Sequence, residues 1–291
     1  MPIRDNNPEP TNPLGIDGIE FIEYATSEPL AFGAILEMMG FAQAARHRSR
    51  EVVLYRQGSM NIIVNADPAA REAMGANVQA TVLSGVAMRV RDANYAYRHA
   101  TDLGAWPIPT RAGAMELNIP GVHGVGDSVI YFVDRYQDFS IYDVDFKPVP
   151  GGDRRDNAIP GLHFFGVVQA IRADRSREWI DFYQQLMGFQ VLPEGKYFGV
   201  LPKGTLLESP CHKFYLQLIE PPADAVDLNW EEALIRVGIG APDVPAATRA
   251  LQKRGVVFVD RDPVQPSDKG ALTQLFKGGV SFELVHSHIE A

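Results

Sequence analysis

Two charged side chains that could do chemistry lie on otherwise apolar segments in the second half of the sequence. Arg236 interrupts the run Leu234-Ile-Arg-Val-Gly-Ile239, and Glu283 follows Phe282 in the last apolar run. A buried guanidinium is costly unless a counter-charge accompanies it, so Arg236 requires an acidic partner. The pattern therefore indicates a buried ionic site in this half of the chain.

Other residues whose types are often catalytic are predicted to have structural roles in this sequence. Glu20 and Glu23 resemble paired acids, but they straddle the two faces of one predicted strand. His47 fits a hydrogen-bonded histidine between domains. Cys211 and His212 are sequence neighbours, and a Cys–His nucleophile needs pairing in space. The sequence has no glycine-rich phosphate loop, serine nucleophile elbow or paired-cysteine zinc motif.

The elements that position these residues follow from a weak internal repeat. Met39-Gly40-Phe41 closes one apolar helical stretch, and Met187-Gly188-Phe189 closes another 148 positions later. In both, glycine stands where a helix end needs a left-handed residue. Two further helices each begin at an aspartate N-cap and end at a glycine 12 residues later, namely Asp92 to Gly104 and Asp243 to Gly255.

Apolar runs between these helices predict strands that outnumber them. In the first half we expect strands at Ile19–Tyr24, Val52–Gln57, Asn61–Asn65, Val86–Val90 and Ser128–Val133, with helices near Leu30–Met39 and Ala93–Leu103. In the second half we expect strands at Phe164–Ala170, Tyr197–Leu201, Phe214–Ile219, Ile235–Ile239 and Val280–Val285, with helices at Ser176–Met187 and Val244–Arg254.

The order of elements predicts an α+β fold of two tandem modules, each made of paired βαβββ units that form a curved mixed sheet, or cup. The proline- and glycine-rich segment from Pro148 to Asp153 is the natural linker. We therefore expect an N-terminal module at residues 1–151, mainly structural, and a C-terminal module at 152–291 that carries the pocket.

Composition limits the classes of partner. The 291 residues are 46% hydrophobic and 22% charged, enough for two domains with their own cores. The net charge of −9 provides no basic field, so nucleic acid is not an expected partner. A single cysteine excludes an internal disulfide, and no segment is apolar enough for a signal peptide or a membrane span. These features predict a cytoplasmic protein without a membrane partner.

The first half closely resembles the 4-hydroxyphenylpyruvate dioxygenase family, and the paired layout resembles the vicinal oxygen chelate superfamily that contains it. The resemblance spans nearly all of residues 14–147. The strings that carry it are Asp17-Gly-Ile-Glu-Phe-Ile-Glu23, Ala45-Arg-His-Arg-Ser49, Leu54-Tyr-Arg-Gln-Gly58, Asn61-Ile-Ile-Val-Asn65, Met115-Glu-Leu-Asn-Ile-Pro120, Ile130-Tyr-Phe-Val-Asp-Arg-Tyr136 and Ser140-Ile-Tyr-Asp-Val-Asp-Phe146.

In the second half the resemblance is thinner, and it implies a change at the family's iron site. The family holds iron with two histidines and a glutamate, the usual facial arrangement for non-heme Fe(II). Aligned on Trp179-Ile-Asp-Phe-Tyr183 and Asp243, the three ligand positions fall on Gly166, Arg236 and Glu283. Only the glutamate is kept, and a permanently protonated arginine cannot ligate a metal. No metal is therefore expected.

The resemblance also implies a consequence for Arg236. If the cup is kept, Arg236 and Glu283 would form a bidentate pair in place of the metal, with space left at Gly166. The pair would either plug a dead metal site or receive the carboxylate of a small organic acid. Family substrate contacts would fall on Gln274, Phe276, Tyr215 and Gln217, with Phe276 packing on the ligand's ring. The connection Asp260 to Leu275 is shorter than in the family, which predicts a more open pocket.

The first hypothesis is thus a divergent dioxygenase-like protein that binds a small, aromatic organic acid in the C-terminal cup, either as a binding protein or as a metal-independent enzyme. The alternative is a true metal-dependent enzyme of the superfamily, an oxygenase, isomerase or lyase with Fe(II) or another divalent metal. A subunit role in a homo-oligomer is a third possibility.

Overall fold

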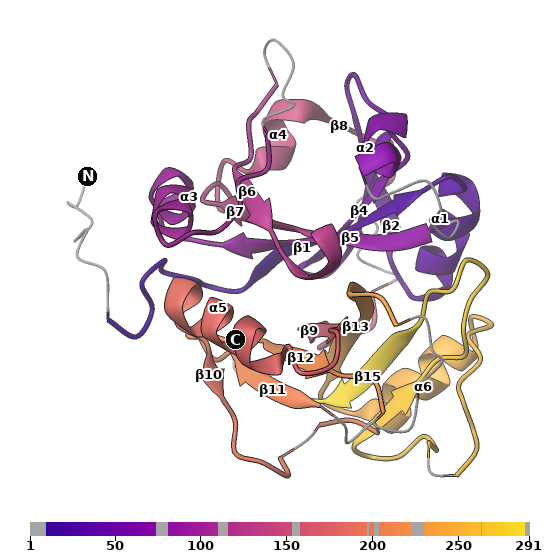
Figure 1. Ribbon diagram of the computed structural model, residues 1–291. Helices are drawn as coiled ribbons and strands as arrows, with labels where there is room; N and C mark the ends of the chain where they lie inside the picture. Colours follow the sequence, from indigo (N-terminus) through magenta and orange to yellow (C-terminus); the bar gives the residue numbers. More distant parts are fainter. Residues whose placement is uncertain are drawn as a thin grey trace.

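The computed structural model describes residues 10–73, 81–109, 116–152, 158–196, 198–200, 204–222, 230–262 and 264–288. The chain forms two stacked modules, the N-terminal one in indigo to magenta and the C-terminal one in orange to yellow (Figure 1). Within the described part, no helix is both long enough and apolar enough to cross a bilayer.

Strands dominate the N-terminal module, as the sequence predicts. Its strands are β1 (Ile19–Thr26), β2 (Ala42–His47), β3 (Val52–Gln57), β4 (Met60–Asn65), β5 (Thr81–Arg89), β6 (Gly121–His123), β7 (Val129–Val133) and β8 (Phe146–Pro148). Its helices are α1 (Pro29–Met38), α2 (Pro68–Ala73), α3 (Ala93–Asp102), the short 3-10 turn η1 (Val125–Asp127) and α4 (Ile141–Asp145).

The C-terminal module repeats this order. Its strands are β9 (His163–Ala170), β10 (Gln190–Val191), β11 (Thr205–Glu208), β12 (Tyr215–Ile219), β13 (Ala233–Ala241), β14 (Gly270–Leu272) and β15 (Phe282–His286), and its helices are α5 (Ser176–Met187) and α6 (Val244–Gln252). The predicted module boundary falls between β8, which pairs with β2, and β9.

Strand pairing shows that the two modules share one topology. In the first, β1 is parallel to β4 and antiparallel to β5, and β5 is parallel to β7. In the second, β9 is parallel to β12 and antiparallel to β13, and β13 is parallel to β15. The sheets meet where Leu234 of β13 pairs with Leu83 of β5. The predicted α+β fold of tandem βαβββ modules is therefore confirmed.

Local signals place the helices where the sequence predicts them. The side chain of Asp92 accepts a hydrogen bond from the amide of Tyr95, and Asp243 does the same for Ala246. The helix-ending glycines have left-handed backbones, with φ of 95° at Gly40 and 77° at Gly188. These caps satisfy backbone groups that a helix end otherwise leaves unpaired.

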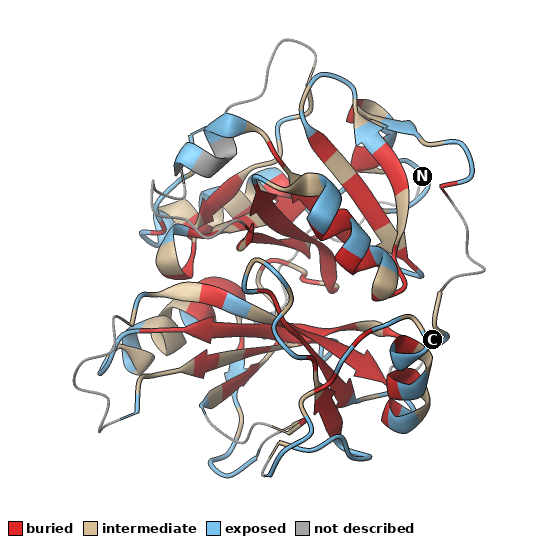
Figure 2. Cartoon of the chain, turned by 90° about the vertical axis from the view of Figure 1, so that its right-hand side faces the viewer, coloured by how far each residue is buried: buried red, intermediate tan, exposed pale blue. Residues whose placement is uncertain are grey.

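Buried residues concentrate on the strands and on the helix faces that pack against them, whereas the outer faces of the helices are exposed (Figure 2). One large apolar cluster joins helices and sheets of both modules and includes Tyr24, Phe132 and Phe282. A second cluster, which includes Phe21 and Leu54, lies in the N-terminal module alone.

One predicted strand is wrong within the described residues. Tyr197–Leu201 was expected to be extended, but residues 198–200 form no strand and Gly199 and Val200 lie in a turn. Tyr197 and Leu201 lie outside the described residues, and the strand of this region is β11. Gly199 has φ of 69°, a conformation that glycine adopts without steric cost. The turn brings the amide of Val200 to Glu283, so the local backbone serves the site instead of the sheet.

Candidate functional site

The side chains of Arg236 and Glu283 meet in the C-terminal module. The Nη1 atom of Arg236 on β13 donates to Oε2 of Glu283 on β15 over 3.1 Å, and the two side chains are 13% and 5% exposed. The predicted pairing is confirmed, but its bidentate form is wrong. The second carboxylate oxygen accepts instead from the amide of Val200 at 3.1 Å, and Nε of Arg236 is buried without a hydrogen-bond partner among the described residues.

Burial sets the electrostatics of this pair. Burial raises the pKa of Glu283, while the Arg236 charge and the Val200 amide act in the opposite direction. Gly199 is part of the same arrangement, because a Cβ at this position would come within 2.2 Å of Oε1 of Glu283. The turn at Gly199 therefore closes tightly over the carboxylate.

Strand register places two other predicted residues on the same face of the sheet. Tyr215 and Glu283 lie in one cross-strand row that passes through Gly166 and Gly238, so the side chains of Tyr215 and Glu283 project from the same face of the sheet. By the same register Gln217 lies level with Val168 and Arg236 in the adjacent row. Tyr215 and Gln217 therefore face the same cup as the ion pair.

Aromatic rings line this face of the cup. Phe165 stacks on Tyr215 with ring centroids 4.9 Å apart, and Phe198 contacts both rings. The hydroxyl of Tyr215 donates to Glu208 at 3.0 Å, and burial together with that carboxylate raises the pKa of Tyr215 to about 12. The tyrosine is thus a neutral hydrogen-bond donor near neutral pH.

Phe276 lies elsewhere, and the role of Gln274 stays a prediction. The side chain of Gln274 is exposed, while Phe276 packs against Phe282 with ring centroids 6.3 Å apart. Phe282 immediately precedes Glu283 in β15, and neighbouring strand residues point to opposite faces. The structure therefore does not bring Phe276 together with Arg236 and Glu283.

The expectation of space at Gly166 is also wrong. A Cβ on Gly166 would lie 2.1 Å from the carbonyl oxygen of Tyr215, so the neighbouring strand already occupies the position where a side chain would begin. Glycine occupies this position because the backbones of β9 and β12 approach too closely for a side chain.

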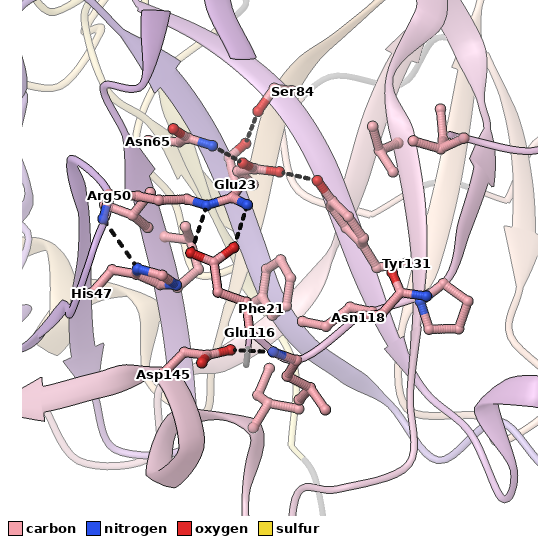
Figure 3. A pocket seen from close by; sticks show the side chains of 18 of the residues that line it. Phe21, Glu23, His47, Arg50, Asn65, Ser84, Glu116, Asn118, Tyr131 and Asp145 are labelled. Carbon is pink, nitrogen blue, oxygen red and sulfur yellow. Dashed lines mark hydrogen bonds and ion pairs between the residues drawn. The ribbon is translucent and has the colours of Figure 1, made fainter. Parts of the chain in front are cut away.

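Sequence reasoning missed a cavity in the N-terminal module. It has a volume of about 440 Å³, within the range of roughly 300–1,000 Å³ common for small-molecule pockets. Polar side chains around it include Glu23, Asn65 and Tyr131 (Figure 3). The available signal was Glu23 itself, a carboxyl residue on a strand that is buried along its whole length.

His47 also belongs to this cavity and not to an inter-domain contact. Its Nδ1 atom accepts hydrogen bonds from the amides of Ser49 and Arg50 at 3.3 and 3.2 Å, within the turn that follows β2. The expectation of a hydrogen-bonded histidine is met, but its place between the domains is not.

Two tandem βαβββ modules with a site on the face of the second sheet define a protein of the vicinal oxygen chelate class. The family model described as "Hydroxyphenylpyruvate dioxygenase, HPPD, N-terminal" matches residues 10–147. Hemolysin VllY of Vibrio vulnificus (strain CMCP6) is 33% identical over 263 residues, 85% of this chain and 73% of its own. The 4-hydroxyphenylpyruvate dioxygenase of Pseudomonas aeruginosa is 30% identical over 264 residues, 86% of this chain and 73% of its own.

A solved structure agrees with these relatives. A fusion of a xylose isomerase-like TIM barrel with 4-hydroxyphenylpyruvate dioxygenase superposes with a TM-score of 0.75 at 25% identity, covering 100% of this chain and 52% of the fusion. The chain belongs to the 4-hydroxyphenylpyruvate dioxygenase family.

The residues present do not fit the iron that this family implies. Of the three positions that the sequence resemblance assigns to the family's ligands, Gly166 has no donor atom, and Arg236 places a cation 3.1 Å from the carboxylate of Glu283. Over the described ranges, no group of three His, Cys, Asp or Glu side chains is arranged to hold a metal ion.

Proposed function

We propose that the protein is a divergent member of this family that binds a small, aromatic organic acid in its C-terminal cup without the family's iron. The observation that carries the proposal is the guanidinium of Arg236, whose Nε is buried and finds no hydrogen-bond partner in the described part of the chain, while Nη1 bonds to Glu283. A buried donor left without a partner costs about 1–3 kcal/mol. A ligand carboxylate at the Nε edge would remove that cost through a charge-assisted hydrogen bond.

The surroundings of Arg236 favour an aromatic acid. Phe165, Phe198 and Tyr215 supply ring surfaces on the same side of the sheet, where an aromatic ligand could stack or pack edge to face. Gln217 lies level with Arg236 in the same row of the sheet. The alternative, a metal-dependent oxygenase, would require the family's ligand set, and the aligned positions lack two of its donors.

Replacing Arg236 with lysine tests the proposal. Lysine keeps the positive charge beside Glu283 but lacks the planar fork and Nε, so we expect a folded protein whose affinity for an aromatic acid falls by about tenfold or more. Binding of 4-hydroxyphenylpyruvate and phenylacetate is measured by calorimetry in the presence of a chelator. Arg249→Lys, at an exposed site on α6, is the matched control.

Wild-type binding that is lost in Arg236→Lys and kept in Arg249→Lys would support the proposal. The proposal would be overturned if the wild type bound neither acid, or if Arg236→Lys and Arg249→Lys bound them equally well. The ion pair would then only fill the position of the family's metal site.

A further inference from the structure

The cavity of the N-terminal module is walled by apolar side chains and contains two deeply buried carboxylates, Glu23 and Asp145, of which Asp145 is paired with Arg48. Phe21, Val52 and Ile63 project from three neighbouring strands, β1, β3 and β4. Phe21 lies against Tyr131 with ring centroids 5.4 Å apart. Glu23, two residues after Phe21 on β1, is only 6% exposed. An apolar enclosure with a few convergent polar groups is typical of a small-molecule site.

The carboxylate of Glu23 receives hydrogen bonds but no counter-charge. Nδ2 of Asn65 donates to one of its oxygens at 2.7 Å, and the hydroxyl of Tyr131 donates to the other at 2.8 Å (Figure 3). Both donors are neutral, and no described Lys, Arg or His forms an ion pair with Glu23. Burial raises the pKa of Glu23 against these two hydrogen bonds. Each carboxylate oxygen can accept a further hydrogen bond.

Glu20 provides an internal comparison on the same strand. It is equally buried, at 2% exposure, but Nε of Arg89 donates to its carboxylate at 2.6 Å. The free-energy cost of removing a carboxylate from water is normally offset by such a cation. Glu20 has its cation within the protein, whereas no lysine, arginine or histidine in the described ranges pairs with Glu23.

The remaining charges around the cavity are mostly negative. Arg50 is the one lysine or arginine among the described lining residues, and it is already bonded to Glu116 through Nε at 3.3 Å and through its terminal nitrogen. Burial lowers the pKa of His47, so this ring adds no positive charge at neutral pH. The carboxylates in the lining are Glu23, Asp67, Glu116, Asp127 and Asp145, of which Glu116 is paired with Arg50 and Asp145 with Arg48. This balance disfavours an organic acid and favours a cation.

We propose that the N-terminal cavity binds a small organic cation, a primary amine on an apolar or aromatic body, with Glu23 as its counter-ion. The ammonium group donates hydrogen bonds to the free lone pairs of Glu23, and the ring of Tyr131 beside it adds a favourable cation–π contact. The apolar body lies against Phe21 and Ile63. This site is distinct from the Arg236 site in both its module and the charge of its ligand.

The test uses the full-length protein and three probes, benzylamine, 2-phenylethylamine and cyclohexylmethylamine, each compared with its alcohol and carboxylate counterparts by calorimetry. We expect at least one amine to bind saturably at one site per chain, and the matching alcohol and carboxylate to bind about tenfold or more weakly because they cannot neutralise Glu23. No binding by any of the three amines, or equal binding of amine and carboxylate, would overturn the proposal.

Glu23→Gln is the decisive variant. Glutamine has the same shape, its carbonyl still accepts from Asn65, and the hydroxyl of Tyr131 can rotate to accept from its amide, so the fold should persist. Amine affinity should fall by about tenfold or more, while Glu51→Gln, at an exposed site in the same module, should leave it unchanged. A folded Glu23→Gln protein that binds the amine as tightly as the wild type would refute the assignment. Arg236→Lys should also leave amine binding unchanged, which separates this site from the C-terminal one.

Discussion

Replacing Arg236 with leucine is expected to lower the free energy of unfolding by about 3–5 kcal/mol, because it leaves the carboxylate of Glu283 buried without its cation. Glu283 is 5% exposed, and burial already raises its pKa. The free energy is measured by urea denaturation at neutral pH. Arg249→Leu, on the exposed face of α6, should change it by no more than about 0.5 kcal/mol.

The double variant Arg236→Leu/Glu283→Leu separates loss of the pair from loss of one partner. Apolar side chains in place of a buried ion pair are often neutral for stability or stabilising. The double variant should therefore recover most of the stability that Arg236→Leu loses. An Arg236→Leu protein as stable as the wild type would contradict the view that these two charges depend on each other.

Gly166→Ala is expected to lower the free energy of unfolding by about 1–3 kcal/mol, because the added methyl group meets the backbone of β12 and the strands must move apart. The relevant contact is the 2.1 Å between the added Cβ and the Tyr215 carbonyl oxygen. Thermal and urea denaturation monitored by circular dichroism measure the change.

Gly238 is the matched control for this prediction. It is the cross-strand partner of Gly166 on β13, and a Cβ there would first meet Phe165 at 3.4 Å, an ordinary contact. Gly238→Ala should therefore lower stability less than Gly166→Ala. Alanine also reduces the conformational entropy of the unfolded chain, which stabilises the folded Gly238→Ala protein. If the two variants lost equal stability, the close approach of β12 would not be the reason for glycine at 166.

The regular elements could be predicted because their signals are local. The aspartate caps and helix-ending glycines determined α3 and α6, and apolar runs located β3 and β4 almost to the residue. Tyr197–Leu201 failed because its apolar pattern competes with Gly199, whose turn is stabilised by a hydrogen bond to Glu283, a residue far away in the sequence. Such a bond leaves no trace in the local pattern.

The candidate site could be predicted only in part, for a different reason. Charge and burial indicate that Arg236 needs an acidic partner, the family resemblance implies that this partner is Glu283, and the structure confirms the pairing. That Arg236 makes only one hydrogen bond to Glu283 could not be foreseen. The register of β13 against β9 shifts just before Arg236 and again just after Gly238, which changes how β13 lies against β9. Phe276 was misplaced because it lies just outside a strand, where period-two alternation assigns no face.

The N-terminal cavity escaped prediction because its residues are dispersed. Glu23, Asn65 and Tyr131 belong to β1, β4 and β7, and only the pairing of these strands brings them together. An acidic residue on a strand can equally be a structural group, as Glu20 illustrates through its bond with Arg89. The distinction depends on which cations lie nearby, and that is a property of the folded chain.

The central claim is that an arginine–glutamate pair has replaced the family's iron site. The most direct measurement is the metal content of the purified protein by elemental analysis after incubation with Fe(II), with and without 4-hydroxyphenylpyruvate and oxygen. We expect near-zero stoichiometry in every condition, because Gly166 and Arg236 supply no donor atom. One firmly bound iron per chain would contradict the claim and would place the protein among the metal-dependent enzymes of its family.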